Sequence, residues 1–213
     1  MTNNLLRKMA ICVLLAISGG AMAQEEPGGE MAWFRDVCIK TRQSVATNDL
    51  GGIADCLSAF SDINAEEFLD SDFKATRKSA PSSLKGHLLF SASYLETLLA
   101  AKMDEERVEE DEHSTRARPP GGLKYAHCLI PARTTSTFEY EGEGYMELLV
   151  VCEHEQLLGV KIDVNAQGYH HQIANNKADG IRFHRWEMKR DGTVRLSIIN
   201  PTGKAVSVVV VSN

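Results

Sequence analysis

The chain has 213 residues, and its composition of 43% hydrophobic and 24% charged residues is that of a globular protein with one or two domains. Its 29 acidic residues outnumber its 23 lysines and arginines, which gives a net charge of −6. Nucleic acids and anionic membranes are negatively charged and do not attract an acidic protein, so we expect neither of them as a partner.

The first 23 residues have the pattern of a cleaved signal peptide. A basic start, Arg7-Lys8, precedes an apolar run over residues 9–18, and Ala21-Met22-Ala23 is a small-x-small cleavage site. This run is too short to span a bilayer, and no later segment reaches the roughly 18 apolar residues that a spanning helix needs. We therefore predict an exported chain without a membrane span, periplasmic or extracellular, that begins at Gln24.

Helical spacing of apolar residues is typical of the next part of the chain, residues 24–112. We predict helices over residues 30–47 and 53–60, separated by a break at Asn48-Asp49, and a helical turn from residue 64. A longer helix is predicted to begin after Ser83. The helical half lacks a large core of its own, so we expect it to pack on the remainder of the protein.

A linker is predicted over residues 113–122. Before it, seven of the nine residues 104–112 are acidic, and negative charge opposes the macrodipole at a helix C-terminus. We interpret this run as a solvated helix end, with recruitment of cations or basic partners as the alternative. Pro119-Pro120-Gly121-Gly122 is the strongest break in the chain and places a domain boundary before residue 123.

The C-terminal part, residues 123–213, changes to a β pattern. About eight short segments separated by turn signals such as NPTG are typical of an antiparallel β-sandwich or jelly roll, so the fold class is α+β. Residues 206–211 are nearly all valine, which predicts a strand buried on both faces at the centre of a sheet. The predicted strands cover residues 126–130, 134–140, 145–153, 157–164, 168–173, 181–188, 194–199 and 205–211.

Four cysteines remain in the mature chain, and an even number in an exported protein suggests disulfides. Cys38 and Cys56 are equidistant from Thr47, which lies next to the predicted break between the first two helices. Cys128 and Cys152 are equidistant from a point beside the EYEGEG turn. Residues equidistant from the turn of an antiparallel hairpin meet, so we predict the bridges Cys38–Cys56 and Cys128–Cys152. A redox or metal role is the alternative, which the absence of a CxxC motif disfavours.

No motif in the sequence assigns a catalytic residue, a metal or a cofactor. The chain has no GxSxG, GxGxxG, P-loop or EF-hand pattern, and the sequence after His154 lacks the second histidine of HExxH. Ser82 and Lys85 fit an S-x-x-K spacing, but the companion motifs are absent and we interpret the serine as a helix cap. His170 and His171 are adjacent, so they point to opposite faces of a strand and rarely bind one metal.

The candidate binding residues are Tyr169, His170, His184 and Trp186. An aromatic ring beside hydrogen-bonding groups on the outer face of a sandwich suits a sugar or a peptide. His184 and Trp186 are predicted to share one face of their strand. The alternative, which we favour for Trp186, is that this ring packs under the helical half.

The ending LSIINPTGKAVSVVVVSN resembles the last hairpin of jelly-roll modules such as the bacterial pre-peptidase C-terminal domain. The signal ending GGAMAQ and the order of helical part, Pro-Gly linker and β half resemble uncharacterised secreted proteins of Bacteroidota. These resemblances imply an accessory module and supply no catalytic residues.

Three functions remain open from the sequence. We predict a non-catalytic module that binds a protein or glycan at the cell envelope through a few buried aromatics. The alternative is a secreted hydrolase, metal-dependent or not, which requires at least three of six β-half side chains to converge in one pocket. A purely structural envelope protein is the third. The six side chains are Glu153, His154, Glu155, Asp163, His170 and His184.

Overall fold

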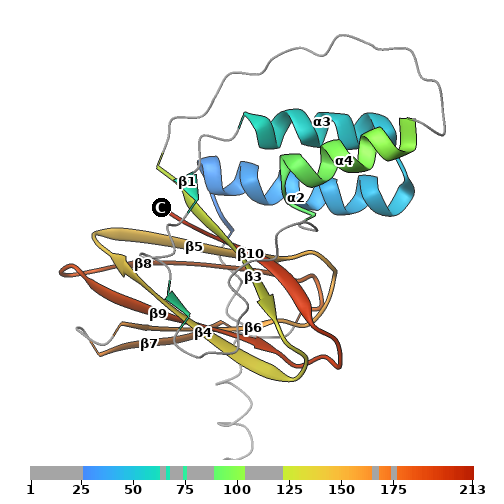
Figure 1. Ribbon diagram of the computed structural model, residues 1–213. Helices are drawn as coiled ribbons and strands as arrows, with labels where there is room; N and C mark the ends of the chain where they lie inside the picture. The colour runs from blue at the N-terminus through green and yellow to red at the C-terminus, as the bar shows by residue number, and fades with distance from the viewer. Residues whose placement is uncertain are drawn as a thin grey trace, which may run out of the picture.

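The computed structural model describes residues 26–62, 66–67, 74–75, 89–103, 122–164, 168–173 and 177–213, and three helices lie over one face of a β-sandwich (Figure 1). The predicted α+β class, with a helical region packed on a C-terminal sandwich, is confirmed. The predicted signal peptide, the S-x-x-K segment and the linker lie outside the described residues, apart from Gly122. No helix in the described part of the chain is long and apolar enough to cross a membrane.

All eight predicted strands are present, each within two residues of its predicted ends. Their alternation of buried and exposed residues is the period-2 pattern of a sandwich whose strands have an inner face. The strands are β3 (Lys124–Ile130), β4 (Thr134–Gly142), β5 (Tyr145–Cys152), β6 (Gly159–Val164), β7 (Tyr169–Ile173), β8 (Ile181–Glu187), β9 (Gly192–Asn200) and β10 (Val206–Ser212).

The strand order is that of a jelly roll. One sheet has the order β1-β3-β10-β5-β8 and the other β2-β4-β9-β6-β7, so most consecutive strands alternate between the two sheets. Two short strands complete the edges: β1 (Glu66–Glu67) pairs in parallel with β3, and β2 (Lys74–Ala75) pairs antiparallel with β4. We expected residues 66–67 in a helical turn, and pairing with β3 overrides that local preference.

Strand β10 lies between β3 and β5, at the centre of its sheet, as its valine run predicted. Val208 and Val210 point into the core between the sheets, whereas Val209 and Val211 point toward the helices. Asn200, the first residue of the predicted NPTG turn, is buried and donates from Nδ2 to the carbonyl oxygen of Lys204 at 2.7 Å, so it holds the β9–β10 turn closed.

The helices are α2 (Gly29–Thr47), α3 (Leu50–Ser61) and α4 (Ala92–Met103). The predicted break between α2 and α3 is confirmed: Asn48 has a φ of 57°, and the Asp49 carboxylate accepts a hydrogen bond from the Gly52 amide at 3.0 Å. The long helix predicted from Ser83 begins only at Ala92. Residues 89–91 form a turn, and Ser91 caps the helix by accepting from the Tyr94 amide at 3.3 Å. Ser83 lies outside the described residues.

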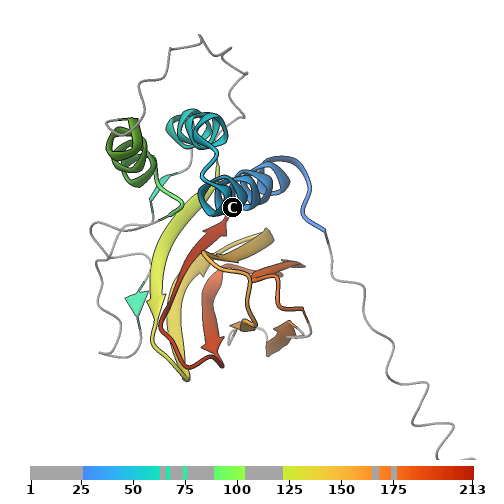
Figure 2. The ribbon, with the colours of Figure 1, turned by 90° about the vertical axis from the view of Figure 1, so that its right-hand side faces the viewer.

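Helix α2 packs on the outer face of the sheet that contains β10 (Figure 2). The contact is a second core in which three helical side chains meet the outward residues of β5, β8 and β10. Arg42 adds a polar contact, because its Nη1 donates to the Asp179 carbonyl oxygen at 2.7 Å. The apolar members are Met31, Phe34 and Cys38 on α2, and Leu149, Val151, Phe183, Val209 and Val211 on the sheet.

The four cysteines are buried free thiols, so neither predicted disulfide is present. The prediction of Cys128–Cys152 is wrong because β10 inserts between the two strands that carry these residues. Both cysteines face Val208 from opposite sides. Two strand spacings separate their Cα atoms by about 9.5 Å, beyond the roughly 7 Å that a disulfide permits.

Candidate functional site

Three of the four predicted binding residues, Tyr169, His184 and Trp186, come together at an open edge of the sandwich. Their strands, β7 and β8, are the last strands of the two sheets. The Tyr169 hydroxyl lies 2.7 Å from Nε2 of His184, and the two rings stack with centroids 6.4 Å apart. His171, which was not among the predicted residues, stacks on His184 at 3.7 Å with an angle of 4° between the rings.

His170 lies on the opposite face of β7 from this cluster. Its Nδ1 is 2.7 Å from Oδ1 of Asp163, and its side chain is 68% exposed. Successive residues of a strand point to opposite faces, so Tyr169 and His171 share the inner face while His170 points outward. The sequence alternation therefore identifies His171, not His170, as the neighbour of Tyr169.

Trp186 is only 6% exposed and belongs to the core between the sheets. The expectation that it lies on the outer face is wrong, and so is the alternative that it packs under the helices. Phe183, on the other face of β8, fills that second position. The stack of Tyr169, His171, His184 and Trp186 thus closes the end of the sandwich core, and its rings are mostly engaged with one another.

The side chains required for a hydrolase do not converge in the described residues. His184 is in the stack, and His170 and Asp163 are on the outer face of the other sheet. Glu153 lies near the helices, where its carboxylate accepts a hydrogen bond from the Leu89 amide at 2.9 Å and burial raises its pKa. Within the described residues no three His, Cys, Asp or Glu side chains gather as metal ligands.

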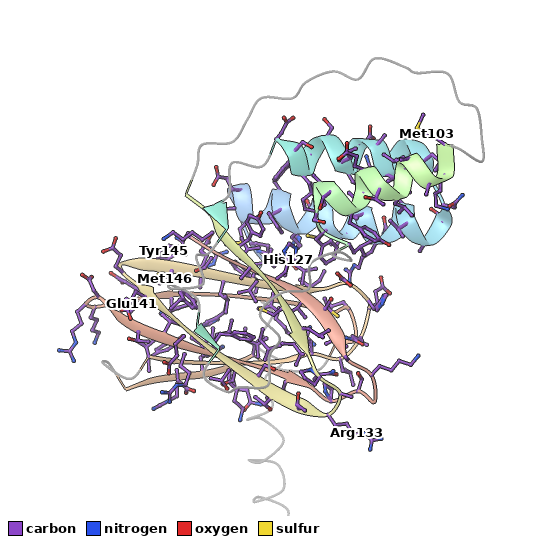
Figure 3. The ribbon with its side chains drawn as sticks, viewed as in Figure 1. Met103, His127, Arg133, Glu141, Tyr145 and Met146 are labelled. Atoms are coloured by element: carbon purple, nitrogen blue, oxygen red, sulfur yellow. The ribbon has the colours of Figure 1, made fainter. Side chains whose placement is uncertain are left out.

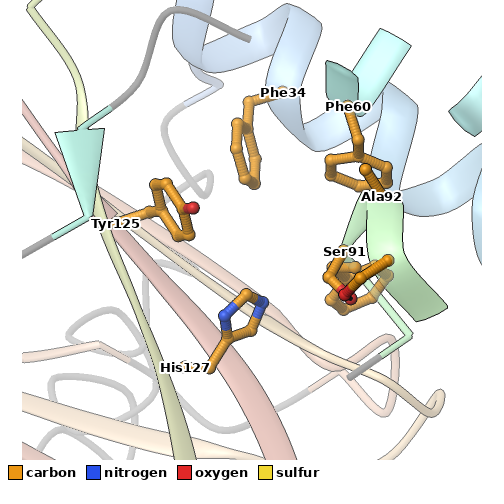
Figure 4. Close-up of a pocket in the computed structure, with 8 residues that line it drawn as sticks. Phe34, Phe60, Ser91, Ala92, Tyr125 and His127 are labelled. Atoms are coloured by element: carbon orange, nitrogen blue, oxygen red, sulfur yellow. Dashed lines mark hydrogen bonds between the residues drawn. The ribbon is translucent and has the colours of Figure 1, made fainter. Parts of the chain in front are cut away.

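A different site lies between the helices and β3, and we call it the aromatic pocket. It is a cavity of about 250 Å³. The side chains that form its walls come from α2, α3, the start of α4 and β3, and they point toward a common centre (Figure 4). The residues that matter for its chemistry are Phe34, Phe60, Phe90, Ala92, Tyr125 and His127.

The rings of the aromatic pocket are held in place by edge-to-face contacts. Phe34 and Phe60 meet with centroids 6.1 Å apart and planes at 79°, and Tyr125 and His127 meet at 5.6 Å and 81°. Phe34 and Phe90 are each only 2% exposed. Edge-to-face pairs of this kind contribute about 1 kcal/mol beyond simple burial, so these walls are fixed before any ligand enters.

His127 is the polar residue at the base of the aromatic pocket, beneath the helices (Figure 3). Its Nε2 is buried and has no hydrogen-bond partner. Burial lowers the pKa of His127 to about 4, although a hydrogen bond with the Phe90 backbone opposes this shift. The imidazole is therefore neutral at physiological pH.

Sequence reasoning missed this pocket. Tyr125 and His127 are two residues apart in a predicted strand, which places both rings on one face. That signal was available, but nothing local indicates that Phe34 and Phe60, far away in the chain, would cover that face. The helical side chains are brought there by the packing of α2 on β10.

No family model and no curated protein matches the chain. Among solved structures, the enzymatically active domain of tailspike protein 4 from bacteriophage CBA120 aligns with 42% of this chain and 17% of its own, at 8% identity and a TM-score of 0.28. A family two carbohydrate esterase from Cellvibrio japonicus aligns with 41% of this chain and 26% of its own, at 13% identity and the same TM-score of 0.28. At this level neither likeness supports a function, and the resemblances noted from the sequence stay predictions.

Proposed function

We propose that this chain is an exported, non-catalytic binding module of the cell envelope that holds a partner protein through the aromatic pocket. The observation that carries the proposal is a cavity of about 250 Å³ in which four aromatic rings surround a buried imidazole nitrogen without a hydrogen-bond partner. Recesses of this kind, walled by rigid rings, are where partner side chains contribute most of the affinity in protein interfaces.

The size of the pocket favours one side chain over a whole small molecule. Pockets that enclose complete small ligands measure about 300–1,000 Å³, and this cavity lies below that range. A single ring from a partner fills such a recess, while the rest of the partner rests on the surrounding surface. The pocket is then the centre of an interface rather than a closed binding chamber.

The polarity of the pocket favours a protein over a glycan. A sugar ring carries several hydroxyl groups, and each one buried without a hydrogen bond costs about 1–3 kcal/mol. Ser91, before α4, and Ser93, in its first turn, use part of their hydrogen-bonding capacity within the protein: Ser91 accepts from the Tyr94 amide, and its Oγ lies 3.5 Å from that of Ser93. An aromatic side chain needs far fewer polar contacts than a sugar.

Substitution of Ala92 by tryptophan tests the proposal. Ala92 lines the pocket and is half-buried, so an indole at this position fills the cavity from within. We expect recovery of the partner from an envelope extract, measured by quantitative mass spectrometry on tagged mature protein, to fall by about tenfold or more.

The matched control is Ala100→Trp, on the same helix but exposed and away from the pocket. This variant should recover the partner as well as the unmodified chain does. Circular dichroism and thermal unfolding of both variants check that the fold is intact. Equal recovery of the same proteins by the unmodified chain and by Ala92→Trp would exclude the pocket as the binding site.

A further inference from the structure

The unpartnered nitrogen of His127 gives the aromatic pocket a specific hydrogen-bonding character. A neutral imidazole has one N–H donor and one lone-pair acceptor. Nε2 is buried and has no hydrogen-bond partner within the protein. It accepts a hydrogen bond when the ring proton is on Nδ1, so a ligand in the cavity that carries a donor can satisfy it.

The remaining walls narrow the choice of ligand further. Among the described residues that line the cavity there is no Lys or Arg to compensate an anion, and no Asp or Glu to replace the hydration of a cation. Four aromatic rings favour a flat apolar group. The unpartnered nitrogen of His127 favours a group that also carries one donor.

We infer that the aromatic pocket selects an uncharged aromatic ring bearing one hydrogen-bond donor, and that this donor binds Nε2 of His127. The inference rests on the proposed function and specifies the side chain that the partner inserts. A phenol meets these requirements, and in a partner protein the phenol is a tyrosine. Tyrosine and phenylalanine then differ at this site by one hydroxyl, which His127 detects.

The test uses p-cresol and toluene, which reproduce the tyrosine and phenylalanine side chains. Each is titrated into the full mature chain and followed by ligand-observed NMR. A site built around a buried acceptor discriminates against an analogue that leaves the acceptor unpaired, so we expect p-cresol to bind about tenfold more tightly than toluene. Equal affinities would overturn the inference, and so would tighter binding of n-butylamine, the analogue of a lysine side chain.

Two variants of His127 assign the preference to its nitrogen. His127→Leu removes the acceptor and should reduce the ratio of the two affinities to about one while toluene still binds within about twofold. His127→Gln places an amide oxygen near the same position and should restore part of the preference for p-cresol. A preference that persists unchanged in His127→Leu would show that another group recognises the hydroxyl.

The outcomes separate this inference from the proposed function. If both rings bind equally, the pocket is a binding site but the assigned donor is wrong. If neither binds, the proposed function and the inference both fail. N-acetyltyrosinamide, which carries a peptide backbone, distinguishes the source of the phenol. Binding of p-cresol without binding of N-acetyltyrosinamide would support the inference that the pocket selects a phenol. It would overturn the proposal that a partner protein supplies this phenol and would favour a free phenolic molecule.

Discussion

At the scale of single residues, His127 should make the stability of the protein depend on pH. Burial holds its pKa at about 4 in the folded chain, whereas an exposed histidine titrates near 6.5. As the pH falls below about 6.5 the unfolded chain binds this proton first, so stability is lost between pH 6.5 and 4. We expect this residue alone to lower the unfolding free energy by roughly 2–3 kcal/mol between pH 7.5 and 4.5.

Urea denaturation at the two pH values measures this loss. His127→Gln, which does not titrate, should show a smaller difference between pH 7.5 and 4.5 than the unmodified chain. Ala100→Gln is the control, because Ala100 is exposed on α4 and neither side chain titrates. This substitution should leave the pH dependence unchanged. An identical pH dependence in His127→Gln and in the unmodified chain would contradict the prediction.

Single residues also show what could and could not be predicted from the sequence. The alternation of side chains along β7 is a local property, and it alone places Tyr169 and His171 on one face of the strand and His170 on the other. The pocket residue His127 is different, because its neighbours Phe34 and Phe60 come from helices that only tertiary packing brings to β3. A local pattern gives the direction of a side chain, but it does not give the surface that the side chain meets.

At the scale of elements, strands were predictable and their partners were less so. The eight longer strands, β3 to β10, follow from apolar patterns between turn signals, whereas the two-residue edge strands β1 and β2 were not predicted. The prediction of the bridge Cys128–Cys152 was wrong because it assumed that the two cysteines pair directly across a hairpin. Instead β10, from the far end of the chain, lies between the strands that carry them. The valine run had already indicated a central strand, but not which two strands it separates. Helix α4 begins at Ala92, later than predicted, and Ser91 makes its cap.

The helical hairpin of α2 and α3 carries the other predicted bridge, between Cys38 and Cys56. Both thiols are buried, and they lie close enough that Cys56 helps to raise the pKa of Cys38, after the larger effect of burial. If the chain is exported to an oxidising compartment, as we propose, we expect these two residues to form a disulfide. Such a loop stabilises a fold by about 3 kcal/mol in the chain-entropy model.

Mass spectrometry of mature protein purified under oxidising conditions shows whether the Cys38–Cys56 bridge forms. The expected mass is about two hydrogens below the fully reduced value, since β10 separates Cys128 from Cys152 and excludes the second predicted bridge. Cys128→Ser should leave that difference in place, whereas Cys56→Ser should abolish it and lower the unfolding free energy by about 3 kcal/mol. A fully reduced native mass would reject the bridge and weaken the case for an oxidising compartment.

At the scale of the whole molecule, the helices cover an apolar region of one sheet that the sandwich alone would leave exposed. The outer face of the sheet containing β10 has an apolar centre, with Val209, Val211 and Phe183 each at most 2% exposed because α2 covers them. The aromatic pocket lies at the same junction, so its walls exist only when both parts are folded together. The two parts should therefore unfold in one cooperative transition.

Expression of residues 122–213 alone tests this dependence. Removal of the helices exposes a contiguous apolar patch on a central strand, so we expect most of this fragment in the insoluble fraction, and dye binding by whatever remains soluble. The matched control is the same fragment with Val209→Thr and Val211→Thr, which makes the uncovered face more polar and should raise its solubility. A soluble, monomeric fragment without these substitutions would mean that the sandwich is an independent domain. The aromatic pocket would then be a contact between two separable parts, and binding at the pocket would depend on how firmly they dock.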